Sequence, residues 1–200
     1  MPGSSDRLRR IRRAWPGAAA TVLALALTGC GHISLGLGGG HHHRLHRYRS
    51  GQCRPGDPLD GVYLPFRLHV KKRCVTVSGR VDCVRKEPDG DAHIELHLGR
   101  RYRHLLTPAS VYQRCPQHAG PHLLLEIIPQ HGELPFPSNS ADRAGFVTPK
   151  APEPGERVRV TGPYVLDTNA LHDLIYPGKQ VANWAEIHPV WNITVIRRSK

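Results

Sequence analysis

The chain has 200 residues, 39% of them hydrophobic, so it is long enough for one globular domain and apolar enough to bury a core. Its 20 glycines and 18 prolines leave few helix-forming runs, which disfavours a mainly helical fold. The formal net charge is +12 and arginines outnumber lysines 22 to 6, a balance that suits an anionic partner or, alternatively, reflects genomic base composition.

Residues 1–29 have the pattern of a secretory signal sequence. The first thirteen residues contain five arginines and one aspartate, and an apolar run of ten residues follows at 18–27. A membrane-spanning helix needs about 20 apolar residues, so a permanent transmembrane helix is not expected here.

The apolar run ends in Leu27-Thr28-Gly29-Cys30, which resembles the lipobox of bacterial lipoproteins. The resemblance implies cleavage before Cys30, a diacylglyceryl group on its thiol, and acylation of the new amine. Acyl chains would hold the protein on the extracytoplasmic face of the cell membrane. An ordinary signal sequence with an accidental cysteine is the alternative.

Residues 30–51 are predicted to be a flexible tether, because they are rich in Gly, His and Arg and have no apolar period. The histidines at 41–43 and His46 could bind a transition metal through neutral imidazole nitrogens. The alternative is a solvated spacer that binds metal only opportunistically. The folded domain is predicted to span residues 52–200.

Four cysteines remain besides Cys30, and an even number in an exported domain indicates two disulfides. Cys74 and Cys83 lie nine residues apart on one predicted strand, roughly 30 Å, so they cannot pair with each other. Two connectivities remain. We favour Cys53–Cys74 with Cys83–Cys115, because the first bond pins the N-terminal segment onto the domain.

The first predicted strand covers residues 74–84, where Val75, Val77, Val81 and Cys83 alternate with polar residues. Gly79 indicates a β-bulge in it. The following Pro88-Asp89-Gly90-Asp91 is turn sequence.

The second predicted strand, 92–98, places one set of side chains inward (Ile94, Leu96, Leu98) and the alternate set outward (His93, Glu95, His97). A nearly continuous apolar strand is expected at 122–128. After a proline-rich connection at 150–155, alternation resumes at 157–166, and the last strand is predicted at 186–196. Pro189 has no amide hydrogen, so it belongs at an edge or a bulge of that strand.

Five strands in about 150 residues favour an all-β fold, and a small Greek-key, OB-like five-stranded barrel is the fold we predict. Disulfides would staple it. A β-sandwich is the alternative, because the number of strands alone separates the two poorly.

Three motifs resemble a group of uncharacterised secreted bacterial proteins over residues 53–196. They are Cys74-Val-Thr-Val-Ser-Gly-x-Val, Glu87-Pro-Asp-Gly-Asp-x-His93, and Asp167-Thr-Asn…His172…Trp184-x-Glu186-Ile-His188-Pro189-Val190. Members often have the histidine and the tryptophan of the third motif close together, whereas residues 173–183 separate them here. The resemblance implies a fold and export but no activity.

In an OB-like barrel, the loops joining strands 1–2 and 4–5 lie beside the face of strands 2 and 3, where ligands usually bind. The candidate residues from these regions are Asp89, Asp91, His93, Asp167, His172, Glu186 and His188. Converging carboxylates and imidazoles could bind a divalent cation or supply a general acid and base. The alternative is structural: turn formation, caps of loop amides, or a buried hydrogen-bond network.

The motifs favour a membrane-anchored binding or structural module over an enzyme. The nucleophile-elbow, zinc-protease, P-loop and paired-cysteine motifs are all missing from the sequence. Scattered aromatic residues disfavour single-stranded nucleic acid as a partner, whereas an anionic ligand or wall polymer suits the charge. The alternative function is a metal-dependent hydrolase, directed at phosphodiesters, that uses the Asp/His/Glu cluster.

Overall fold

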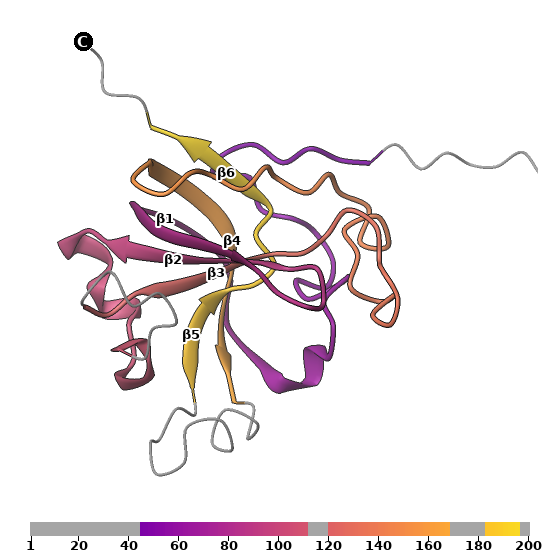
Figure 1. Ribbon diagram of the computed structural model, residues 1–200, viewed down its shortest axis with the longest axis horizontal. Coiled ribbons are helices and arrows are strands. Elements are labelled where there is room, and N and C mark those ends of the chain that lie inside the picture. Colours follow the sequence, from indigo (N-terminus) through magenta and orange to yellow (C-terminus); the bar gives the residue numbers. More distant parts are fainter. Residues whose placement is uncertain (1–44, 112–119, 169–182, 197–200) are drawn as a thin grey trace, which may run out of the picture. The chain divides into compact units, whose positions relative to one another are not determined.

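The chain is mostly β structure within residues 45–111, 120–168 and 183–196, which the computed structural model describes (Figure 1). These residues belong to one compact unit, His41–Lys200. Its strands are β1 (Leu68–Lys86), β2 (Ala92–Leu98), β3 (Leu123–Ile127), β4 (Arg157–Asp167), β5 (Trp184–Ile187) and β6 (Asn192–Val195). Short 3-10 turns are η1 (Pro65–Arg67), η2 (Arg100–Leu105) and η3 (Pro108–Val111). No helix in the described part of the chain could cross a membrane.

All six strands belong to one hydrogen-bonded sheet in the order β1-β2-β3-β5-β4-β6, and β1 also pairs with β4. The β3–β5 pair is parallel and the other pairs are antiparallel. The prediction of an all-β, disulfide-stapled fold is therefore confirmed at this level. The predicted signal sequence, Cys30, Cys115 and His172 lie outside the described residues.

β1 is the longest strand, and it pairs with two neighbours in succession. Residues 68–80 pair with β4 and residues 79–86 pair with β2, so the two pairings overlap at Gly79 and Arg80. A Cβ atom on Gly79 would lie 2.5 Å from the carbonyl oxygen of His97. Glycine is therefore required there because the neighbouring backbone comes so close.

The prediction of a β-bulge at Gly79 is wrong, because the bulge lies three residues further along β1. The register between β1 and β2 shifts between Val81 and Cys83, so Asp82 is the extra residue. Asp82 was expected on a solvent face, yet only 3% of its surface is exposed.

The predicted last strand, 186–196, is two strands, because the chain breaks its pairing at Pro189. This residue has no amide hydrogen, and the next amide, of Val190, donates to the carbonyl oxygen of Glu126 at 2.9 Å. β5 therefore pairs with β3 and β4 before Pro189, and β6 pairs with β4 after it. Pro189 separates two strands instead of sitting at the edge of one.

The main core lies between the inward faces of β1 to β5. The predicted inward residues of β2 are all buried, and β3 is buried at every position. Glu95 was predicted to face outward, but it is only 6% exposed, because the second face of this part of the sheet is covered as well. The outer face of β2, β3 and β5 therefore places polar side chains in a buried environment.

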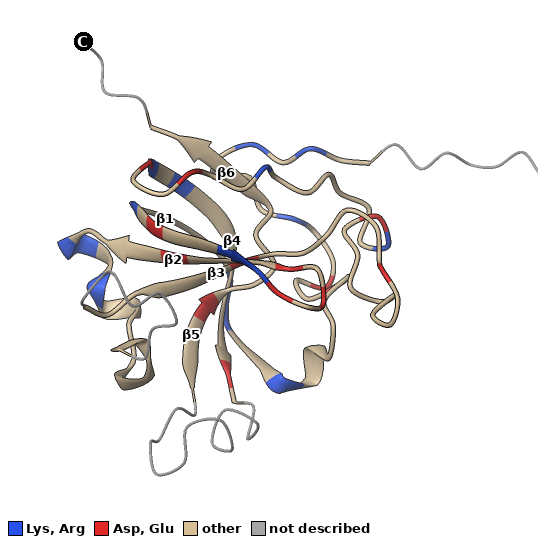
Figure 2. Cartoon of the chain, in the orientation of Figure 1, with Lys and Arg blue, Asp and Glu red and all other residues tan. Residues whose placement is uncertain are grey.

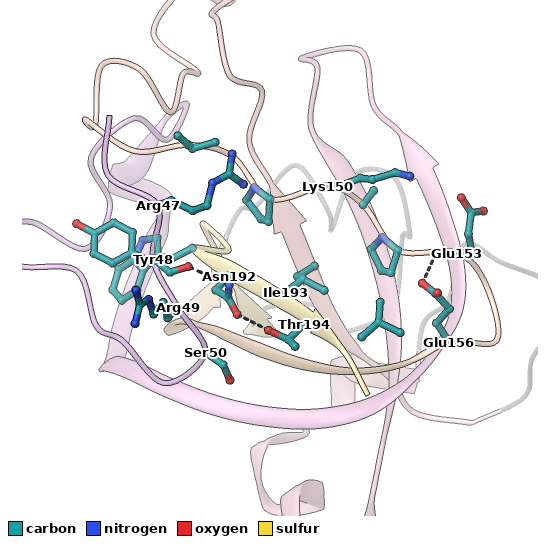
Figure 3. Close-up of a pocket in the computed structure, with 16 residues that line it drawn as sticks. Arg47, Tyr48, Arg49, Ser50, Lys150, Glu153, Glu156, Asn192, Ile193 and Thr194 are labelled. Carbon is teal, nitrogen blue, oxygen red and sulfur yellow. Dashed lines mark hydrogen bonds between the residues drawn. The ribbon is translucent and has the colours of Figure 1, made fainter. Parts of the chain in front are cut away.

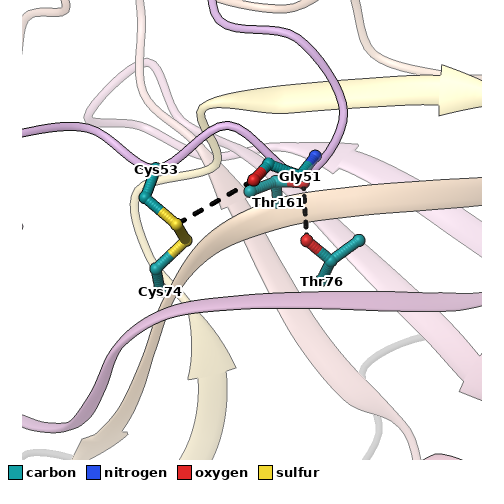
Figure 4. The surroundings of a disulfide bond; sticks show 5 residues. All are labelled: Gly51, Cys53, Cys74, Thr76 and Thr161. Atoms are coloured by element: carbon teal, nitrogen blue, oxygen red, sulfur yellow. Dashed lines mark hydrogen bonds between the residues drawn. A yellow bond between two sulfur atoms is a disulfide. The ribbon is translucent and has the colours of Figure 1, made fainter.

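The predicted Cys53–Cys74 disulfide is present and joins the N-terminal segment to β1 (Figure 4). Near it, the amide of Gly51 donates to Oγ1 of Thr161 on β4 at 2.9 Å. Cys83 is disulfide-bonded too, while its predicted partner lies outside the described residues.

The predicted tether ends earlier than expected, because residues 45–51 pack on the domain. Tyr48 is 7% exposed and lies in a second core cluster with Phe146 and Trp191. Its carbonyl oxygen accepts a hydrogen bond of 2.9 Å from Nδ2 of Asn192. His46 forms an isolated bridge with Phe146, so it belongs to the folded domain and not to a free His-rich spacer.

Candidate functional site

A cluster of acidic and histidine side chains lies on the outer face of β2, β3 and β5. The core residues of these strands alternate with the cluster residues, so side chains of the two sets point to opposite faces. His93 of β2 pairs with Glu126 of β3, and Leu124 of β3 pairs with Glu186 of β5. The acidic position on β5 is visible in Figure 2. Asp91 precedes β2 and His188 follows β5, which brings both to the same end of the sheet.

Glu126 is the central anion of this acid–histidine cluster. Its Oε1 lies 3.1 Å from Nε2 of His93, and its Oε2 lies 2.9 Å from Nδ1 of His188. Oε2 of Glu186 lies 3.4 Å from the same Nδ1. On the other side of the ring, Nε2 of His188 is 3.9 Å from Oδ2 of Asp91. The strands therefore bring three carboxyl groups around one imidazole.

Burial sets the electrostatics of the cluster. It raises the pKa of Asp91 to about 8 and that of Glu186 to about 7, and in both cases the negative charge of Glu126 adds to the effect. Burial opposes ionisation of Glu126 too, but His188 and His93 outweigh it and hold the pKa of Glu126 well below its usual range.

Burial of the ring lowers the pKa of His188, but the carboxyl groups of Glu126, Glu186 and Asp91 together raise it well above its ordinary value. The pKa of His93 is raised as well, because Glu126 outweighs the burial of its ring. At neutral pH the cluster therefore contains an ion pair between Glu126 and His188, flanked by two carboxyl groups that lose their protons reluctantly.

Four of the seven candidate residues of the predicted site meet in this cluster: Asp91, His93, Glu186 and His188. Asp89 has a local role instead, because its Oδ1 accepts the amide hydrogen of Asp91 at 3.2 Å within the turn. Asp167 pairs with Arg67 at 2.8 Å. His172 lies outside the described residues.

Sequence reasoning missed Glu126 and Asn139. Glu126 is the one charged residue in the apolar run at 122–128 apart from His122, and a carboxylate inside a buried strand is itself a signal of a buried partner. Asn139 comes from a loop, and its Nδ2 donates to Oδ1 of Asp91 at 2.7 Å. A short polar loop residue of this kind gives no comparable signal.

The donor set fits a divalent cation. Asp91, Glu126 and His188 each offer one ligand atom, and these atoms lie within 4.8 Å of one another. Nε2 of His188 is buried and has no hydrogen-bond partner among the described residues. Because the other ring nitrogen faces Glu126, the imidazole is oriented with Nε2 available as a ligand atom.

The cluster itself is closed to substrates. Asp91, Glu126, Glu186 and His188 are each at most 2% exposed. A structural metal site is closed in this way, whereas a catalytic site keeps one position open to water or substrate. The arrangement therefore suits holding an ion or a proton more than turning over a substrate.

A separate open groove lies between residues 47–50, residues 149–156 and β6 (Figure 3). Its volume is about 700 Å³. Arg47, Arg49 and Lys150 line it, together with Glu153 and Glu156. None of the described candidate residues contributes to this basic groove, so sequence reasoning did not identify it.

Comparisons of the chain with protein-family models, with curated proteins and with solved structures found no match.

Proposed function

We propose that the protein is a lipid-anchored, extracytoplasmic binding module with an OB-like barrel, and that its acid–histidine cluster binds a divalent cation. Cys30 carries the anchor in this proposal. The single observation that supports the cation is the buried Nε2 of His188, which lacks a hydrogen-bond partner among the described residues and lies 3.9 Å from Oδ2 of Asp91.

The strand pairings support the OB-like barrel. Five strands pair in the circuit β1-β2-β3-β5-β4-β1, and the sixth pairs only with β4. A small five-stranded Greek-key barrel requires a circuit of this kind. A β-sandwich would divide the strands between two sheets, whereas the described strands belong to one.

The charge balance supports the cation. Three carboxyl groups surround His188, and buried charges are stable only when they are paired or coordinate a metal. Arg67 lies near enough for Asp167, Glu126 and Glu186 to raise its pKa, but its Nη1 is engaged by Asp167 at 2.8 Å. A divalent cation would replace the proton of Asp91 and, with Glu126 and His188 as further ligands, would link the start of β2 and the end of β5 to β3.

The basic groove supports an anionic ligand, because three cationic side chains line it against two carboxylates. Cys30 and Arg47 are 17 residues apart, so an extended chain keeps the groove within roughly 60 Å of a lipid on Cys30. Wall polymers with phosphate groups are anionic ligands within that range. A metal-dependent hydrolase needs a metal position that is open to water or substrate, and the closed cluster offers none. Binding is therefore the function that the geometry supports best.

The test of the cation uses the full-length protein in detergent, carrying His41→Ser, His42→Ser and His43→Ser so that the His-rich segment does not bind metal. Metal analysis and thermal melting with and without Mn²⁺ or Mg²⁺, ions that prefer carboxylate ligands, are compared for the parent protein and Asp91→Asn. We expect the parent to melt at a higher temperature with the ion, and Asp91→Asn to lose that increase.

Asp89→Asn is the matched control, since its Oδ1 can still accept the turn amide and Asp89 is not one of the three residues whose ligand atoms gather around the proposed ion. It should keep the full response to metal. A parent protein that melts at the same temperature with and without each ion would contradict the proposal. So would an unchanged response in Asp91→Asn.

A further inference from the structure

A second histidine–carboxylate group lies at the other end of the outer face of β2 and β3. Nε2 of His122 is 2.6 Å from Oδ2 of Asp82, and Nδ1 of His97 is 3.8 Å from the same oxygen. The ligand atoms of the three residues lie within 4.8 Å of one another. This surface triad shares no residue with the acid–histidine cluster.

The β-bulge brings Asp82 into the triad. Val81 pairs with Leu96 and Cys83 pairs with Glu95, so Asp82 has no partner in β2 and is the inserted residue. A bulge re-aims side chains, and bulges are common beside functional sites. Here the carboxylate of Asp82 reaches His122, two strands away from β1.

The triad is buried on one side and open on the other. The side chains of Asp82 and His122 are 1% and 3% exposed, whereas that of His97 is 40% exposed. Nη2 of Arg80 lies 2.7 Å from Oδ1 of Asp82, which leaves Oδ2 to the two imidazoles. The open side gives an ion and a water molecule access from solvent.

The ion pair with Asp82 uses Nε2 of His122 and leaves the other ring nitrogen, Nδ1, without a role. This nitrogen is buried and has no hydrogen-bond partner within the described residues. Oε2 of Glu95 lies 3.9 Å from this nitrogen. A carboxylate beside the second nitrogen of a histidine is the usual partner of a metal-binding imidazole, because it fixes the ring and raises its basicity.

We propose that Asp82, His97 and His122 form a zinc site, with Glu95 as the residue that positions His122. Two imidazoles and one carboxylate are ligands that Zn²⁺ prefers, and three protein ligands leave a fourth position for water. Zinc would separate Asp82 from His122 and draw His97 inward, because ligand atoms around a tetrahedral zinc ion lie about 3.3 Å apart. This inference goes beyond the cation of the acid–histidine cluster and does not depend on it.

The zinc site is tested on the full-length protein in detergent, carrying His41→Ser, His42→Ser and His43→Ser. Zinc binding is measured by titration calorimetry, and Co²⁺ is used as a spectroscopic probe because tetrahedral Co²⁺ absorbs strongly in the visible range. His97→Gln is the main variant, since His97 is the exposed ligand and its replacement leaves the buried Asp82–His122 pair in place.

We expect His97→Gln to weaken zinc binding at this site at least 100-fold and to abolish the tetrahedral Co²⁺ absorption. Glu95→Gln should weaken binding about 10- to 100-fold, as expected for a partner of a metal-binding histidine. His69→Gln is the matched control, because His69 is an exposed histidine of β1 outside the triad, and it should bind zinc as the parent does.

Asp91→Asn separates this site from the acid–histidine cluster, and it should keep the cobalt spectrum of the triad. Equal zinc affinity in His97→Gln and the parent would overturn the zinc site. An equal loss in His69→Gln would overturn it as well, since binding would then be non-specific. The zinc site would also be overturned if the parent showed neither zinc binding nor cobalt absorption.

Discussion

Nδ1 of His188 lies 2.9 Å from Oε2 of Glu126, a contact that joins β3 to the residue that follows β5. β3 and β5 are the parallel pair of the sheet, and their register has only two paired positions. Both side chains are at most 2% exposed, so water does not screen their interaction. The ion pair therefore adds a side-chain contact between two strands that share few backbone hydrogen bonds.

Glu126→Gln should lower the free energy of unfolding by about 1–3 kcal/mol, the cost of removing a buried hydrogen-bond partner. The cost stays in this range because His188 can release its proton when the carboxylate is gone. We therefore also expect the pKa of His188 to fall, which histidine NMR titration measures alongside chemical denaturation. The exposed Glu133→Gln is the control and should change neither quantity. An unchanged His188 pKa in Glu126→Gln would show that this carboxylate is not its partner.

The metal-free protein should become less stable as the pH rises from about 5 to about 8. The pKa values of Glu186 and Asp91 in the folded state are about 7 and about 8, above those of the unfolded chain. For an acid shifted in this direction, the stability present at low pH is lost as the pH rises through the folded-state pKa. The free energy of unfolding, measured in a chelator at each pH, should therefore decline across this interval. Asp91→Asn should flatten the decline above pH 7, and a flat parent profile would contradict the prediction.

Cys53→Ser combined with Cys74→Ser should lower the free energy of unfolding by about 3 kcal/mol, because the disulfide closes a loop with a sequence separation of 21. Equilibrium denaturation of this variant and of the oxidised parent measures the difference.

Thiol counting under denaturing, non-reducing conditions should find no free thiol in the Cys30→Ser variant. Two free thiols there would rule out the predicted Cys83–Cys115 bond.

Cys30→Ser should release the protein from membranes into detergent-free extracts, because the predicted lipid is attached through the Cys30 thiol. Fractionation of cells that produce the parent and the variant measures this release. The chain would need a different anchor if the variant stayed membrane-bound at the level of the parent.

Arg47→Ala combined with Arg49→Ala should weaken binding of inorganic polyphosphate about fivefold, because exposed ion pairs contribute about 0.2–1 kcal/mol each. Binding should also weaken as salt rises, since both side chains are exposed. Arg100→Ala combined with Arg103→Ala removes the same charge from η2, outside the groove, and serves as the control. Equal affinities of the two double variants would mean that net charge and not the groove determines binding.

Local patterns in the sequence predicted those parts of the fold that depend on a few neighbouring residues. Alternation along β2 identified Ile94, Leu96 and Leu98 as core residues, because successive side chains of a strand point to opposite faces. The reach of one strand excluded a Cys74–Cys83 bond, and the Cys53–Cys74 bond that the structure contains was the one favoured among the remaining connectivities. The positions of Asp91, His93, Glu186 and His188 at one end of the sheet were also predicted, since they flank strands that an OB-like order places together.

Only the tertiary structure decided the features that depend on contacts between distant segments. Glu126 became the centre of the cluster because the parallel pairing of β3 with β5 brings His188 to it, and nothing local in 122–128 specifies that pairing. The β-bulge lies at Asp82 and not at the predicted Gly79. The backbone of β2 comes close to Gly79, whereas the register between β1 and β2 shifts at Asp82. Tyr48 joined the core although its surroundings in the chain are polar, since the aromatic ring packs beside Trp191 and Phe146. Hydrophobic burial is non-directional and reaches across the chain, so a strand's pattern reveals its face but not its partner.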